Sequence, residues 1–190
     1  MVKDLARQTV AGLRILLVFT VITGVVYPLA VWGVGKAFGD RADGRPVTLD
    51  GQVVGSVLLG QNFEGAAWFH SRPSANDYDT FASAPSNLGP SNPDLITSIK
   101  ERRAAVAKEN GVALSAVPAD AITASGSGLD PQISPAYAAL QVKRVAAANG
   151  LSVDAVKAMV DDATQGRALG FLGEPTVNVL QLNLAVDKGH

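Results

Sequence analysis

The chain has 190 residues, enough for one domain of ordinary size with an appendage. Hydrophobic residues make up 47% of it and charged residues only 17%, which excludes a disordered polyelectrolyte and indicates contact with a membrane. A formal net charge of -1 leaves no basic excess to neutralise phosphates, which argues against nucleic-acid binding. With no cysteine and two histidines, the sequence excludes disulfides and thiolate or histidine-rich metal sites. Asp77, Asp79 and Asp130 could bind a hard cation, but a solvated loop is the favoured interpretation, so we expect no bound metal.

A run of 21 residues without a charge, residues 15–35, lies near the N-terminus. As a helix rising 1.5 Å per residue, it spans the ~30 Å hydrocarbon core of a bilayer. The apolar region of a cleaved signal peptide is shorter, about 7–15 residues, so we interpret the run as an uncleaved single-pass transmembrane helix.

Basic residues dominate the segment before this run, which predicts the orientation of the chain. By the positive-inside rule, residues 1–14 form a cytoplasmic N-terminus, residues 15–35 the transmembrane helix, and residues 36–190 an extracytoplasmic domain on the periplasmic side. The charged residues that decide this are Lys3, Arg7 and Arg14 against Asp4.

Small, hydroxyl and aromatic residues recur at helical spacing within the run. They are Thr20, Thr23, Gly24, Tyr27 and Pro28. Small and hydroxyl residues let helices approach closely in lipid, so this set predicts a membrane face that binds a partner subunit. The alternative is that Gly and Pro are simply common in membrane helices.

Turn and cap residues predict an α+β domain after the transmembrane helix. Asp50-Gly51 between β-branched runs indicates a hairpin within residues 48–59. Residues 71–93 are rich in Ser and Pro and indicate a long loop, which tends to be functional when it is ordered. Residues 176–186 suit either a strand with a bulge or a short buried helix.

Three helices are expected in the second half of the chain. One opens at Asn92-Pro93 and ends at Gly111, and another opens at Ser134-Pro135 and ends at Gly150. A third is capped by Ser152.

No catalytic set assembles convincingly from the sequence. The alternative to a binding protein is a membrane-anchored outer-face serine hydrolase that uses Ser127, His70 and Asp130, although the SGSG segment lacks the G-x-S-x-G spacing. Backbone N–H groups of the loop at residues 125–130 can bind an anion or a partner carbonyl. Equally, its glycines can serve only tight packing and positive φ.

Several ordered motifs resemble one family over nearly the whole chain. They are GSVLLGQNF at 55–63, FHSRPSANDY at 69–78, SNLGPSNP at 86–93, TASGSGLDPQISPAYA at 123–138, QVKRVA at 141–146 and GEPTVNVLQLNLAVD at 173–187. Together with the anchor they resemble the C subunit (KdpC) of the Kdp-type bacterial potassium-transporting P-type ATPase. One departure is Ser83-Ala84-Pro85, where the family often shows a Ser-Gly-Gly turn.

This resemblance implies a non-catalytic subunit that assembles and stabilises a high-affinity potassium uptake complex in the bacterial inner membrane. The implied partners are a potassium-channel-like subunit, a P-type ATPase subunit and a small single-span subunit, besides membrane lipid. The resemblance also implies a catalytic chaperone that raises the affinity of the ATPase subunit for ATP. The sequence itself carries no Asp-Lys-Thr-Gly phosphorylation motif, so the chain is not the phosphorylated pump.

The candidates for binding a partner subunit or nucleotide are Arg72, Ser125, Gly126, Ser127, Gly128, Asp130 and Gln141. ATP is expected only at the level of the whole complex. The predicted orientation conflicts with direct ATP contact, because ATP is cytoplasmic and only about 14 residues of this chain are expected there. A structural or gating role at the outer mouth of the complex is therefore the favoured hypothesis.

Overall fold

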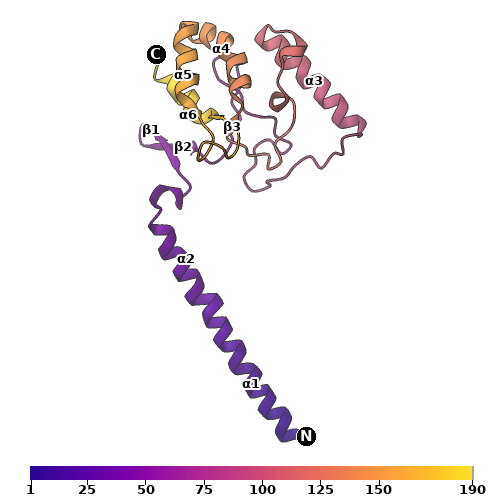
Figure 1. Cartoon of the computed structure of the whole chain (residues 1–190), viewed down its shortest axis with the longest axis vertical. Helices are drawn as coiled ribbons and strands as arrows, with labels where there is room; N and C mark the ends of the chain where they lie inside the picture. Colours follow the sequence, from indigo (N-terminus) through magenta and orange to yellow (C-terminus); the bar gives the residue numbers. More distant parts are fainter. Residues whose placement is uncertain (190) are drawn as a thin grey trace. The chain divides into compact units, whose positions relative to one another are not determined.

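The computed structural model describes residues 1–189 and separates the chain into two compact units, Met1–Arg45 and Pro46–His190 (Figure 1). The first unit is mostly one long helix. The second is a mixed domain of helices and short strands, which confirms the predicted α+β domain on a single N-terminal apolar helix.

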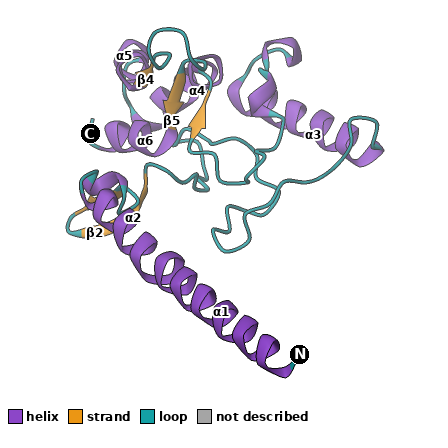
Figure 2. Ribbon diagram, turned by 60° about the horizontal axis from the view of Figure 1, so that its bottom comes forward, coloured by secondary structure: helices purple, strands orange, loops and turns teal. Residues whose placement is uncertain are grey.

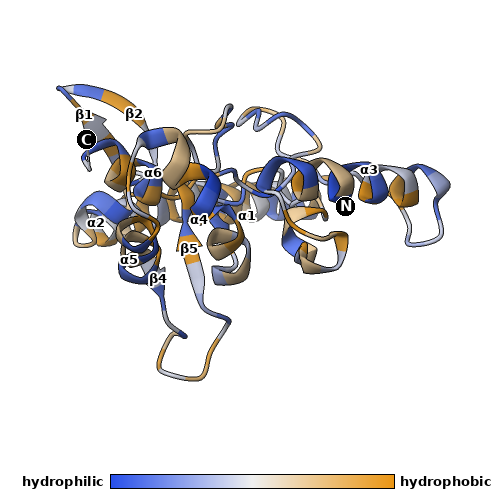
Figure 3. Ribbon diagram, turned by 90° about the horizontal axis from the view of Figure 1, so that it is seen from above, coloured by the Kyte–Doolittle hydropathy of each residue, from blue (hydrophilic) through white to orange (hydrophobic). Residues whose placement is uncertain are grey.

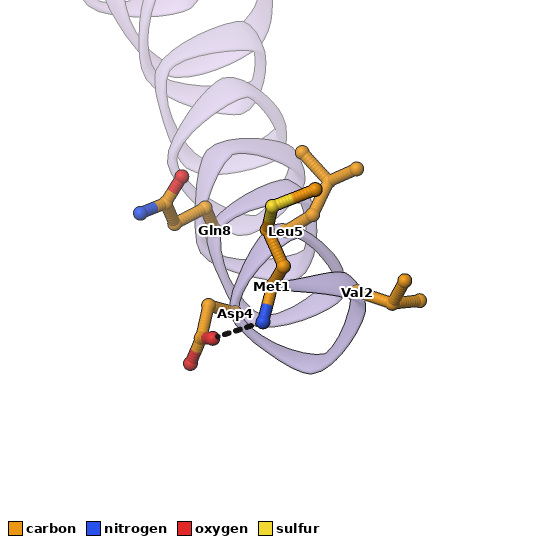
Figure 4. Close-up of a pocket in the computed structure, with 5 residues that line it drawn as sticks. All are labelled: Met1, Val2, Asp4, Leu5 and Gln8. Carbon is orange, nitrogen blue, oxygen red and sulfur yellow. Dashed lines mark hydrogen bonds and ion pairs between the residues drawn. The ribbon is translucent and has the colours of Figure 1, made fainter.

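The long helix consists of α1 (Val2–Val21), a π-helical turn (Ile22–Val26) and α2 (Tyr27–Lys36). By length and composition it is able to cross a membrane, and none of its most apolar window is buried within the chain. The helix begins 13 residues before the apolar run, so the charged N-terminal segment is also helical. Its first turn is closed by Asp4, whose carboxylate lies 3.0 Å from the N-terminal ammonium (Figure 4).

The π-helical turn directly precedes the proline of this helix. Pro28 has no N–H and its ring crowds the preceding turn, which favours a local change of helix type. The N–H of Tyr27 accordingly donates to the carbonyl of Ile22, five residues back. One extra residue in a turn rotates the following side chains by about 100°. The predicted face from Thr20 to Pro28 therefore spans a π-helical turn and does not lie on one uniform α-helix.

The mixed domain opens with the expected hairpin. Strand β1 (Pro46–Leu49) pairs antiparallel with β2 (Gln52–Ser56), and the register shifts between Val47 and Thr48, where β2 has one extra residue, Val54. Asp50 and Gly51 form the turn with φ of 50° and 80°, which is the left-handed geometry that an Asp-Gly hairpin requires.

The three predicted helices are confirmed with their caps. They are α3 (Pro93–Asn110), α4 (Pro135–Asn149) and α5 (Val153–Ala163). The side chains of Asn92, Ser134 and Ser152 each accept a hydrogen bond from a backbone N–H in the first turn. Gly111 and Gly150 end α3 and α4 in the left-handed conformation.

The ambiguous segment after residue 175 divides into a strand and a helix. Strand β5 (Thr176–Asn178) lies between β3 (Gln132–Ile133) and β4 (Thr164–Gln165) in an antiparallel sheet. Helix α6 (Val179–Asp187) follows at once, and the side chain of Asn178 caps it by accepting from the N–H of Gln181.

The core lies where β5 packs among α4, α5 and α6 (Figure 2). Its fully buried apolar side chains include Phe69, Ile133, Val145, Val156, Val177, Leu182 and Val186. Helix α3 contributes little, since its only buried residue is Ala107 and hydrophilic and hydrophobic residues alternate along it in Figure 3. Two single 3-10 turns, Leu114–Ala116 and Ala119–Ala121, connect α3 to the rest.

Residues 57–92 contain neither helix nor strand. They connect the hairpin to α3, contain the whole 69–78 motif and overlap the motifs at 55–63 and 86–93. Because a segment of this length has no ladder of its own, groups from elsewhere must satisfy its backbone polar groups where it is buried, and many of these groups are side chains. Those side chains build the candidate site.

Candidate functional site

Two buried amide side chains hold the start of the irregular segment. Gln141 on α4 accepts from the N–H of His70 at 2.7 Å and donates to its carbonyl at 3.3 Å. Asn183 on α6 does the same for Phe69, at 2.8 Å and 3.0 Å. Each amide thus replaces the partner that a strand would have in a sheet. These side chains are 0% and 2% exposed, respectively.

Arg144 holds the residues just before this point. Its guanidinium donates to the carbonyls of Ala66 at 2.8 Å and Trp68 at 2.9 Å, and to the side-chain oxygen of Gln141 at 2.8 Å. Burial lowers the pKa of Arg144, and the nearby carboxylate of Glu109 opposes that shift. Arg144 therefore fixes the backbone of residues 66–68 through their carbonyl groups.

The sequence predicts Gln141 as part of a partner- or nucleotide-binding loop, and the structure places it elsewhere. It lies within helix α4, is fully buried, and both polar atoms of its amide are bonded to the protein. A side chain in this position supports the fold and presents no surface to a ligand.

Residues 71–85 of the irregular segment interlock by polar contacts with a second loop, residues 123–130. Arg72 forms an ion pair with Asp130 at 2.8 Å and also donates to the carbonyl of Thr123 at 3.3 Å. The hydroxyl of Ser83 donates to the carbonyl of Ser127 at 2.9 Å. The structure thus brings Arg72 of the 69–78 motif together with Ser127 and Asp130 of the 123–138 motif.

The two serines of the 123–130 loop are used inside the loop. The hydroxyl of Ser125 accepts from the N–H of Ser127 at 3.3 Å and of Gly128 at 3.0 Å. The hydroxyl of Ser127 accepts from the N–H of Leu129 at 3.0 Å and contacts Asp130 at 3.3 Å. These N–H groups are therefore not arranged as an open cradle for an anion, and the packing interpretation of the loop is favoured.

The two glycines of the 123–130 loop differ in whether a side chain could replace them. Gly128 is buried with φ of +74°, and a Cβ there would collide with the side-chain oxygen of Asn76. Gly126 is exposed, has no positive φ, and has open space where a Cβ would lie. Only Gly128 is thus a conformational and packing requirement.

The imidazole of His70 does not complete a serine triad. Its Nε2 lies 3.0 Å from the carbonyl of Gly65, and its Nδ1 lies 3.5 Å from the carboxylate of Glu109. Among residues 1–189 neither ring nitrogen bonds a serine, and Ser127 contacts Ser125 and Asp130 instead. The arrangement gives Ser127 no general base and argues against the hydrolase alternative.

The sequence did not single out the residues that organise the 71–85 loop. Asn76 donates from its side-chain nitrogen to the carbonyls of Asp79 at 2.9 Å and Ala82 at 2.7 Å. The hydroxyl of Tyr78 donates to the carbonyl of Arg72, and burial raises its pKa. The density of Ser and Asn was the available signal, because these side chains readily bond nearby backbone groups.

Within residues 1–189, no three metal-ligating side chains are grouped.

Known proteins resemble this chain over nearly its whole length. A family model described as the c chain of the K+-transporting ATPase, KdpC, matches residues 9–188. The chain belongs to the KdpC family. A potassium-transporting ATPase KdpC subunit of Kineococcus radiotolerans is 58% identical over 185 residues, covering 96% of this chain and 94% of the relative. Those of Mycobacterium tuberculosis and Streptomyces avermitilis are 54% and 48% identical, over 96% and 98% of this chain and 98% and 96% of the relatives.

The KdpC resemblance inferred from the motifs is thereby confirmed. Two of those motifs, at residues 69–78 and 123–138, supply most of the interlocked loops. In this KdpC chain the loops are therefore a built structural unit rather than a linker.

Proposed function

We propose that this chain is a non-catalytic accessory subunit that assembles and stabilises a potassium-transporting ATPase in the bacterial inner membrane. Its partners there are a channel-like potassium subunit, a P-type ATPase subunit and a small single-span subunit. Family membership supports this proposal, as do relatives that are named subunits of such an ATPase.

One observation carries the proposal: the helix Val2–Lys36 contains a long apolar stretch, and none of its residues is buried within the chain. Apolar surface of this extent is stable only against lipid or other membrane helices. Thr20, Thr23 and Gly24 offer a narrow surface for such a helix, since small residues permit close approach. The hydroxyl of Thr23 is already bonded to the carbonyl of Phe19 at 2.7 Å, so Thr23 contributes to that surface through packing.

The orientation is proposed with the N-terminus in the cytoplasm. A first test uses single cysteines, which report cleanly because the chain has none. Leu114, which is 57% exposed, and Gln8 in α1 are suitable positions. We expect a membrane-impermeant maleimide to label Leu114→Cys in intact spheroplasts and Gln8→Cys only after lysis. The reverse pattern would refute the orientation.

The same experiment bears on ATP. If the domain from residue 46 onward lies outside, it has no access to cytoplasmic nucleotide. Any effect of this chain on the ATP affinity of the ATPase subunit must then be transmitted by the membrane helix or by residues 1–14. We propose such an indirect effect. The helical N-terminal segment, residues 2–14, extends about 20 Å beyond the apolar run and is able to reach a cytoplasmic partner.

Assembly provides the second test. Gly24→Leu should reduce recovery of the other subunits with this chain about tenfold, because a bulky side chain blocks close helix contact. Gly33→Leu is the matched control, with the same change further along the span and open space at both glycines. Co-purification from detergent measures the effect. Equal recovery with both variants would show that the Gly24 surface binds no partner helix.

A further inference from the structure

We propose that the 71–85 loop is a preformed docking element whose Phe81 enters an apolar pocket with a basic rim on a partner protein at the outer side of the membrane. The proposal rests on the assembly function and orientation proposed above, and it assigns the chemistry of one contact.

Phe81 is the most exposed large apolar side chain of the mixed domain, at 101%. Phe69, only 12 residues earlier, is fully buried in the core. Because the ring of Phe81 lies wholly in water, it contributes no hydrophobic stabilisation to this fold. Aromatic residues are enriched at the centres of protein interfaces, where one large ring fills a pocket.

Hydrogen bonds fix the backbone that carries Phe81. The carboxylate of Asp79 accepts from the N–H of Phe81 at 2.9 Å. The side chain of Asn76 spans the loop by donating to the carbonyls of Asp79 and Ala82. The hydroxyl of Ser74 accepts from the N–H of Tyr78 at 3.0 Å. Little ordering is therefore left for binding to impose, which favours affinity.

The loop is also fixed to the domain. Ser83, two residues after Phe81, bonds the carbonyl of Ser127, and Asn76 packs directly against Gly128. Asp77 and Tyr78 have φ of 52° and 60°, a region that residues with side chains seldom occupy. Such backbone persists where the surroundings determine it, and it clusters at binding segments.

Charge selects the class of partner. No basic residue occurs between Arg72 and Lys100, and the exposed Asp77 and Asp79 precede Phe81 by four and two residues. An anionic lipid surface repels this acidic segment, whereas a protein surface with Lys or Arg around an apolar pocket attracts it. The occupant that fits is therefore a basic-rimmed protein pocket.

The decisive experiment places a bimane dye on Phe81→Cys, the only thiol of the full-length chain. In liposomes of phosphatidylethanolamine and phosphatidylglycerol with this chain alone, we expect emission typical of a dye in water. Adding the remaining ATPase subunits should shift that emission to the blue, while the same dye on Leu114→Cys should not respond. A blue shift in liposomes alone, or none with the subunits, overturns the proposal.

A second arm removes the ring. Phe81→Ser should weaken binding of the remaining subunits at least tenfold, and Asp77→Asn should weaken it less and reduce its sensitivity to salt. Phe171→Ser is the matched control, because Phe171 is also an exposed phenylalanine, at 68%. Thermal unfolding should be unchanged in all three variants. Normal assembly by Phe81→Ser refutes this inference alone, whereas a wild-type chain that recovers no subunits refutes the proposed function as well.

Discussion

Gln141→Leu should lower the free energy of unfolding of the mixed domain by about 3–5 kcal/mol, enough to reduce its melting temperature by roughly 10 °C. Leucine has a similar volume but leaves the N–H and carbonyl of His70 without their amide partner. It also removes an acceptor from the guanidinium of Arg144. Each polar group stranded in a dry interior costs about 1–3 kcal/mol.

Thermal unfolding of the full-length chain in detergent, followed by near-ultraviolet circular dichroism, measures this loss. Gln181→Leu is the control, since Gln181 lies on the exposed side of α6 and should change stability by less than about 0.5 kcal/mol. Similar melting temperatures for the two variants would mean that Gln141 does not support the irregular segment.

Gly128→Ala should separate the two interlocked loops. The new Cβ collides with Asn76, whose side chain bridges the 71–85 loop, and the φ of +74° is unfavourable for any L side chain. We expect a loss of about 2–4 kcal/mol and much faster amide hydrogen exchange across residues 74–83.

Gly126→Ala tests the same loop without these two constraints. Gly126 is exposed, with open space at its Cβ position, so its hydrogen exchange and stability should stay close to wild type. Hydrogen exchange followed by mass spectrometry distinguishes the variants. If both substitutions are equally harmless, the loops are held by other contacts than the packing of Gly128 on Asn76.

Local chemistry was sufficient to predict the helices and the hairpin. Asn92-Pro93 and Ser134-Pro135 cap their own helices through bonds to the next few residues, and Asp50-Gly51 forms its own turn. The motifs were likewise sufficient to predict the family. These signals involve neighbours in the chain, so no knowledge of the remaining structure is needed to interpret them.

The bonds that build the candidate site join residues far apart in the chain. Gln141 and His70 are 71 residues apart, Asn183 and Phe69 are 114 apart, and Arg72 and Asp130 are 58 apart. A motif indicates that such residues matter without indicating whether they are buried. For this reason Gln141 was predicted as a binding residue, although it lies inside the domain.

The sequence by itself determined the single apolar helix, the capped helices of an α+β domain and membership in the KdpC family. Only the tertiary structure decided that residues 176–187 divide into a strand and a helix. The apolar pattern there satisfies either form, and the choice is made because residues 176–178 pair with two other strands, after which Asn178 caps the helix. Tertiary structure likewise decided which polar side chains are buried, because a backbone segment without a ladder must find its hydrogen bonds in whatever elements pack against it.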